Sequence, residues 1–160
     1  AGIIGGSPRS GAVPRIYASG EHASILGELD GKGIKVSVLN GPVGHASGLK
    51  MCYAAITKGT AALYASTLMT VKSLGLFEDL IHELEGRQAS TLAAMDGVNS
   101  ISAKAFRWIG EMEEIAATFE DAGSTPMIHM GAAETFQRSV TRESTRSTGA
   151  ELLSKRSNNW

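Results

Sequence analysis

The sequence predicts an α/β region followed by an all-α region. The first third alternates short β-prone segments with a helical segment, in an order that favours a parallel sheet. From Ser47 onward, apolar residues recur at helical spacing and no convincing strand pattern remains. The chain has 19 glycines among 160 residues, a share above the typical ~7%, and they are concentrated in the first third. Glycine-rich turns between short elements are therefore expected mainly in the α/β region.

Short segments make up the α/β region. Ile3 and Ile4 form the end of a strand that runs into a Ser-, Pro- and Gly-rich loop. Arg15–Ser19 and Ile34–Leu39 are β-prone, and Glu21–Leu29 between them has helical spacing. This strand–helix–strand order predicts that the second and third strands pair in parallel.

One long helix is expected over Ser47–Ser73, ending near Gly75. Its many alanines permit close approach of another helix. Gly59 costs about 1 kcal/mol relative to Ala in a helix interior, and it is tolerated if another backbone packs there. Further helices are predicted over Phe77–Leu84, Ala89–Met95, Ile101–Glu120 and Ile128–Val140. The Ser/Thr/Arg/Asn-rich end of the chain, residues 141–160, is expected to be a flexible tail.

Composition excludes several functional classes. The chain has 15 Lys and Arg against 16 Asp and Glu, and this near-neutral balance does not favour binding to nucleic acid. A single cysteine, Cys52, excludes an intrachain disulfide and is interpreted as a small core residue. No apolar run reaches the ~18–20 residues that span a bilayer, so we expect a cytoplasmic protein without a membrane partner. The four histidines are His22, His45, His82 and His129. Their spacing is not that of metal ligands, so no metal is expected.

The most informative segment is Asn40–Thr57, where a glycine turn follows a strand and opens the long helix. A helix start presents unpaired backbone N–H groups and a partial positive charge, which suit an anion. Lys50 lies about one turn inside this helix, and its neighbours Leu49 and Met51 are apolar. A lysine in such surroundings either extends to solvent or has a chemical role. The residues alone leave both interpretations open.

This pattern resembles the β-hydroxyacid dehydrogenase superfamily, which includes 6-phosphogluconate and 3-hydroxyisobutyrate dehydrogenases. That family carries G-x-G-x-x-x-K-x-x-N-N, or K-x-x-H-N, at the start of a long interdomain helix. Gly44 and Lys50 match the first Gly and the Lys at the same spacing, while Ala46 replaces the second Gly. The opening AGIIGG resembles the family's A-P-V-S-G-G substrate loop. The phrases KMCYAAITKG and EMEEIA are most similar to phosphogluconate-dehydrogenase-like proteins with a helical C-terminal domain.

The resemblance implies a domain organisation. Residues 1–44 are expected to be the end of a Rossmann-type parallel sheet, and residues 45–140 a helical domain built around the interdomain helix. Family enzymes begin with a G-x-G-x-x-G turn that binds the dinucleotide pyrophosphate, and this sequence has no such turn. The chain is therefore expected to lack roughly a hundred N-terminal residues of the nucleotide-binding domain.

The resemblance also implies a reaction. Lys50 would exchange a proton with the hydroxyl of a small hydroxy acid while a hydride passes to NAD or NADP. Backbone N–H groups of the glycine loop would face the substrate carboxylate, because no side chain blocks the approach. The other residues assigned in this way are Ile4, Gly5, Gly6 and Tyr53 for the substrate, and Gly44, His45 and Arg107 for the cofactor.

The sequence departs from the family at several of these positions. Ile4 replaces the Ser of the substrate loop, Ala54 replaces the Asn after the lysine, and Tyr53 stands where sugar-phosphate enzymes carry His. The family's late Lys–Asp pair falls near Glu111 and Met112. These changes argue against the substrate of any well-known member.

A second hypothesis belongs to another functional class. The chain would then be a non-catalytic helical dimerisation or interaction module that lacks the cofactor-binding half. Binding of NADH or NADPH separates the two hypotheses. The resemblance implies a homodimer through the helical domain. Because the long helix has apolar and alanine positions on more than one face, the isolated chain is expected either to dimerise through Ser47–Ser73 or to aggregate through exposed strands such as Ile34–Leu39. The acidic run Glu111, Glu113 and Glu114 is interpreted as a solvated helix face.

Overall fold

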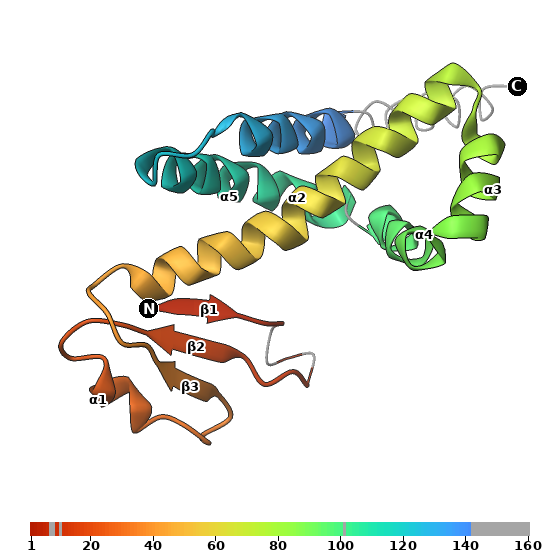
Figure 1. Ribbon diagram of the computed structural model, residues 1–160. Helices are drawn as coiled ribbons and strands as arrows, with labels where there is room; N and C mark the ends of the chain where they lie inside the picture. The colour runs from red at the N-terminus through yellow and green to blue at the C-terminus, as the bar shows by residue number, and fades with distance from the viewer. Residues whose placement is uncertain (7–8, 10, 101, 142–160) are drawn as a thin grey trace, which may run out of the picture. The chain divides into compact units, whose positions relative to one another are not determined.

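The computed structural model describes residues 1–6, 9, 11–100 and 102–141 (Figure 1). The predicted flexible tail lies outside these residues, except for Thr141, which belongs to a helix. The chain divides into two compact units, Ala1–Ala54 and Ala55–Trp160. Helix α2, His45–Leu74, contributes residues to both units.

The first unit contains a three-stranded sheet in the order β1-β2-β3. Its strands are β1 (Gly2–Ile4), β2 (Arg15–Ala18) and β3 (Lys35–Val38). Strands β2 and β3 pair in parallel, as the sequence predicts. Strand β1 pairs with β2 in the antiparallel direction, so the sheet is mixed and the expectation of an all-parallel sheet is corrected. Residues 5–14 form too short a connection for a parallel crossover, which takes about a dozen residues or more.

The helix between β2 and β3 is shorter than predicted. Helix α1 covers Ser24–Gly27 only. Tight turns flank it, because the Ala23 N–H donates to the Gly20 carbonyl and the Asp30 N–H donates to the Gly27 carbonyl. These bonds join residues three apart, which is 3₁₀-type geometry, so the helix does not extend over the whole periodic segment.

The long helix is confirmed, and its C-terminal end has a clear cause. Gly75 adopts a φ of +73°, and the Leu76 N–H donates to the Val71 carbonyl at 2.9 Å. The Gly75 N–H donates to the Lys72 carbonyl at 3.3 Å, which completes a Schellman motif. The glycine that the sequence suggests as a helix stop therefore ends α2 by its positive φ.

The interior of α2 differs from the sequence-based expectation at two positions. A Cβ added at Gly59 would meet nothing within 4 Å, so no backbone of the described chain packs there. Cys52 is exposed, and its interpretation as a core residue is wrong. The buried residues of the helix are alanines at other positions, namely Ala46, Ala54, Ala55, Ala62 and Ala65.

The remaining helices follow the predicted order. They are α3 (Phe77–Arg87), α4 (Ala89–Asp96), the 3₁₀ helix η2 (Gly97–Ser100), α5 (Ser102–Asp121) and a helix over residues 127–141. Helix α5 and helix 127–141 lie side by side (Figure 1), and the Trp108 and Phe136 rings meet edge to face at 5.3 Å. The largest fully buried side chains of the described residues, Phe136, Met112 and Ile115, come from these two helices. Within the described residues, no helix combines the length and the apolar character needed to cross a membrane.

Candidate functional site

The structure brings Lys50 against strand β1. Lys50 lies on the second turn of α2 and is half-buried. A Cβ added at Gly2 would lie 2.5 Å from the Ala46 carbonyl oxygen and 3.1 Å from the Lys50 Cβ. Any residue other than glycine at position 2 would therefore push the first turns of α2 away from the strand. Gly2 was not among the predicted site residues.

The end of β1 and the loop that follows it carry three of the four predicted substrate residues. Ile4 is the last residue of β1 and is half-buried, while Gly5 and Gly6 are exposed. Gly5 has a φ of +133°, and a Cβ added there would lie 3.4 Å from the Pro14 Cα. The loop therefore depends on glycine at position 5 and presents backbone close to solvent. Such backbone can receive a carboxylate group without obstruction by side chains.

The first turn of α2 has fewer unpaired amide groups than the sequence suggests. The Ala46 N–H donates to the Ser19 Oγ at 3.0 Å, and the His45 N–H donates to the Pro42 carbonyl at 3.3 Å. The Gly48 N–H donates to the Gly44 carbonyl at 2.8 Å, so three of the four amide donors of residues 45–48 are satisfied inside the chain. Gly44, just before the helix, has a φ of +104°, and a Cβ added there would meet nothing within 4 Å.

A second glycine in the same turn fixes the position of the His45 ring. The imidazole lies where a Cβ of Gly41 would be, so the ring rests on the backbone of the turn. His45 is nevertheless exposed. Its ring is therefore both held by the turn and accessible to a ligand.

The two other predicted site residues occupy different units. Tyr53 is about half exposed and lies three residues after Lys50, on the neighbouring turn of α2 in the first unit. Arg107 is exposed on α5, in the second unit. The site geometry of the first unit therefore comprises the β1 loop and the beginning of α2, without Arg107.

The helical unit contains a charged cluster that sequence reasoning missed. The Lys58 ammonium donates to the Glu111 carboxylate and lies 5.9 Å from the centre of the Trp108 ring. The Lys58 side chain is only 17% exposed. The interpretation of Glu111 as part of a solvated face is thus wrong, although Glu113 and Glu114 are exposed. A lysine within an alanine-rich helix could have indicated a paired charge, but the local sequence does not identify Glu111 as the partner.

Two further positions have strong structural constraints. Met112, near the place of the family's late Lys–Asp pair, is fully buried. His129 is also buried, and its ring meets the Phe119 ring edge to face at 4.3 Å. Burial lowers the pKa of His129 from its usual 6.5, and its Nδ1 has no hydrogen-bond partner among the described residues. Among all the residues that the structure describes, no group of three or more His, Cys, Asp or Glu side chains is placed to hold a metal ion.

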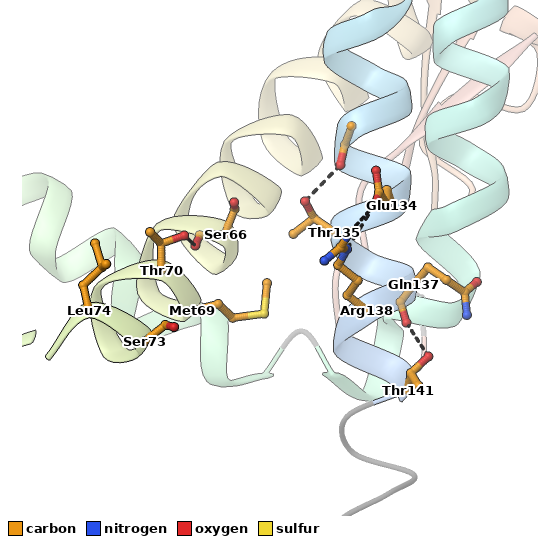
Figure 2. A pocket seen from close by; sticks show the side chains of 11 residues that line it. Ser66, Met69, Thr70, Ser73, Leu74, Glu134, Thr135, Gln137, Arg138 and Thr141 are labelled. Carbon is orange, nitrogen blue, oxygen red and sulfur yellow. Dashed lines mark hydrogen bonds and ion pairs between the residues drawn. The ribbon is translucent and has the colours of Figure 1, made fainter.

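An open groove of about 650 Å³ lies between α2 and helix 127–141 (Figure 2). None of the predicted site residues lines it. The Arg138 guanidinium in its wall already pairs with Glu134, and the Thr70 and Thr135 hydroxyls donate to carbonyls of their own helices. Among the described residues that line it, the groove therefore offers neither an unpaired cation nor the predicted acid–base group.

Comparison with known proteins identifies relatives of the chain. Residues 72–139 match the family model DUF1932, described as a domain of unknown function. A curated relative is the uncharacterized 28.5 kDa protein in the 7S RNA 5′ region of Methanothermus fervidus, which is 34% identical over 71 residues. That alignment covers 44% of this chain and 28% of the relative.

Two solved structures share the fold. Conserved protein MTH1747, of unknown function and described as structurally similar to 3-hydroxyacid dehydrogenases, is 29% identical with a TM-score of 0.66. The match covers 86% of this chain and 55% of MTH1747. A conserved hypothetical protein from Sinorhizobium meliloti 1021 is 24% identical with a TM-score of 0.71, over 84% of this chain and 46% of that protein. This chain thus spans about half the length of either structure. Residues 72–139 thus resemble the DUF1932 family, and the three-stranded sheet and helical body of the chain resemble the corresponding part of a protein described as structurally similar to 3-hydroxyacid dehydrogenases.

Proposed function

We propose that this chain is part of an NAD(P)-dependent oxidoreductase that transfers a hydride between a small hydroxy acid and a nicotinamide. The observation that carries the proposal is the packing of Lys50 against Gly2 of β1, the strand that leads into the Gly5–Gly6 loop. The likeness to MTH1747, a protein described as similar to 3-hydroxyacid dehydrogenases, supports the reaction class.

Each residue of the first unit has a distinct task in this proposal. Oxidation of a hydroxyl-bearing carbon requires a base for the hydroxyl proton, and the Lys50 amine accepts that proton and returns it in the reverse direction. The backbone N–H groups of Gly5 and Gly6 bind the substrate carboxylate, since both glycines are exposed. Tyr53 contributes its hydroxyl to the substrate, and Ile4 forms the apolar wall of the loop.

Of the three residues predicted to bind the cofactor, Gly44 and His45 are accessible to a dinucleotide. Nicotinamide, when bound, exchanges the hydride with the substrate carbon. Gly44 leaves open space for a ligand, and the His45 ring is accessible. Because the His45 and Ala46 amides are already paired, a phosphate group needs a further cation. The assignment of Arg107 to the cofactor rests on the family resemblance alone.

The proposal is tested by NAD(P)-linked oxidation of a panel of small hydroxy acids, using this chain and any longer gene product that contains it. We expect the 160-residue chain alone to be inactive, because its sequence contains no G-x-G-x-x-G turn. In the active product, Lys50→Ala is expected to lower kcat by a factor on the order of 10²–10⁴. The control is Lys72→Ala, an exposed lysine near the other end of α2.

Titration with NADH and NADPH separates this proposal from the interaction-module hypothesis. Binding by the longer product supports the dehydrogenase. A product that binds neither nucleotide and still self-associates would support the non-catalytic module and overturn the dehydrogenase proposal. An unchanged kcat in Lys50→Ala would remove Lys50 from the mechanism.

A further inference from the structure

The groove between α2 and helix 127–141 is formed by one stripe of side chains from each helix (Figure 2). The stripe on α2 runs from Ser66 to Leu74, and the stripe on the other helix runs from Gly131 to Thr141. In both stripes the lining residues recur at helical spacing, so each presents one face of its helix. Both stripes belong to the helical unit, and the groove is therefore a feature of that unit alone.

The surface of this groove is more apolar than its composition suggests. The Thr70, Thr135 and Thr141 hydroxyls each donate to a carbonyl of their own helix. A threonine bonded in this way turns its hydroxyl to the helix and leaves its methyl group for contact with other groups. Met69 extends toward helix 127–141 (Figure 2), and Leu74 is 65% exposed. An apolar segment can therefore bury methyl, thioether and leucine surface in the groove.

The charges of the groove are already compensated. Among the described residues that line it, only Glu134 and Arg138 are charged, and they form an ion pair with each other. A strongly acidic or basic partner would find no free opposite charge there. The groove therefore fits a short uncharged segment better than a charged surface.

The same chain contains such a segment directly after the groove. Thr141 lines the groove, and the sequence continues from it to residue 160. Residues 142–149 are polar or glycine, so Leu152 and Leu153 are the first large apolar side chains after Thr141. Glu151 precedes this pair and Lys155 follows it closely, which confines the apolar part of the segment to the two leucines.

The connection is long enough for the leucines to reach any part of the groove. The wall from Gly131 to Thr141 is about 15 Å long at the helical rise per residue. Residues 142–151 can span up to about 33 Å when extended. The tether also holds the leucines at an effective concentration on the order of millimolar, which a separate partner would have to match.

We propose that Leu152 and Leu153 bind in this groove of their own chain and tie the C-terminal half of α2 to helix 127–141. The two leucines cover Met69 and the threonine methyl groups, and the Glu134–Arg138 pair remains at the wall. This inference does not depend on the proposed dehydrogenase activity.

The first test measures access to the groove by thiol labelling. Ser73→Cys introduces a thiol at an exposed position of the groove wall, and the native Cys52, exposed on the same helix outside the groove, is the internal control. The thiol at position 73 should react with a maleimide at least about fivefold more slowly in the full chain than in a chain that ends after Thr141. Cys52 should react at the same rate in both chains, and circular dichroism should show that the shortened chain remains helical.

The second test keeps the full chain and changes the two leucines. Leu152→Asp combined with Leu153→Asp should raise the labelling rate at position 73 to that of the shortened chain, because a carboxylate is costly to bury without a partner. The matched control is Ser157→Asp combined with Asn158→Asp, which adds the same charge to the polar part of the segment. The control should retain the slow labelling.

Three outcomes overturn the proposal. The first is an equal labelling rate at position 73 in the full and the shortened chain. The second is slow labelling that persists in the double leucine variant, which would mean that another part of the chain covers the groove. The third is protection that increases with protein concentration, which would indicate a second molecule as the occupant. Protection that is independent of concentration and depends on the leucines supports the proposal.

Discussion

The two units differ in what they bury. Among the described residues of the first unit, the buried apolar side chains are small, namely alanines and Pro14, and large strand residues such as Ile3 and Val38 remain exposed. The helical unit buries Phe136, Met112 and Ile115 completely. The first unit is therefore shaped by close backbone approach, and the second by side-chain packing. Substitutions that enlarge a side chain should therefore destabilise the first unit most, whereas substitutions that shorten a buried side chain should destabilise the second unit most.

The largest effect is expected from Phe136→Ala in the helical unit. The change removes a fully buried ring that meets Trp108 edge to face, so it should lower the free energy of unfolding by about 3–5 kcal/mol. The same substitution at the exposed Phe106 should cost no more than about 0.5 kcal/mol. Denaturant titration followed by circular dichroism measures both. A loss of less than about 1 kcal/mol for Phe136→Ala would contradict a core held by large side chains.

The next largest effect on stability is expected from a larger side chain at Gly2 in the first unit. Gly2→Val should destabilise the chain by about 1–3 kcal/mol, because its Cβ would lie 2.5 Å from the Ala46 carbonyl oxygen. Gly48→Ala on α2 is the control, since a Cβ there meets nothing within 4 Å. That variant should be more stable by up to about 1 kcal/mol through its higher helix propensity. Equal stability of Gly2→Val and the parent chain would show that β1 does not lie against α2.

A third prediction compares two ion pairs of the helical unit. Glu111→Gln weakens the partner of the mostly buried Lys58, so it should cost about 1–2 kcal/mol, between the values for exposed and buried pairs. Glu134→Gln removes an exposed pair with Arg138 and should cost no more than about 0.5 kcal/mol. Chemical denaturation of both variants gives the comparison. A larger loss of stability for Glu134→Gln than for Glu111→Gln would indicate that the Lys58 ammonium is exposed to solvent.

The smallest effect is a pH dependence. Burial lowers the pKa of His129 in the folded chain, so the unfolded chain binds more protons as the pH falls below 6.5. The contribution of neutral His129 to stability is therefore complete above 6.5 and is lost as the pH falls through the range below it. His129→Phe should flatten the decline of the unfolding free energy in this range. His82→Phe, at an exposed position, should leave the slope as it is in the parent chain.

The features that depend on nearby residues were predictable from the sequence. The end of α2 follows from Gly75, which adopts a positive φ directly after the helix. The parallel pairing of β2 and β3 follows from the strand–helix–strand order. The direction of β1 was not predictable in this way, because a three-residue strand carries no signal of its partner.

Within the candidate site, the resemblance of both segments to one family predicts that Lys50 and the β1 loop act together. The structure shows Lys50 against Gly2 of β1, and the shared role of Lys50 and the loop stays a prediction. The need for glycine at position 2 was missed, because it arises from a helix that begins at His45, far along the chain. The Lys58–Glu111 pair joins residues that are 53 positions apart, and no local pattern selects that partner. Cys52 shows the related difficulty that a small apolar residue does not reveal which side of its helix is buried.

The edge-to-face contact of Trp108 with Phe136 also gives the molecule an internal reporter. The first unit contains no tryptophan, and the sequence has only one other, Trp160. In a Trp160→Phe chain, tryptophan fluorescence, excited at wavelengths that tyrosine does not absorb, would therefore arise from a single indole ring packed in the helical unit, close to the Lys58 ammonium. Its emission would follow the opening of that unit alone, while far-ultraviolet dichroism would follow helix content along the whole chain. Coincident transitions by the two probes would mean that α2, which both units share, makes them unfold as one cooperative body.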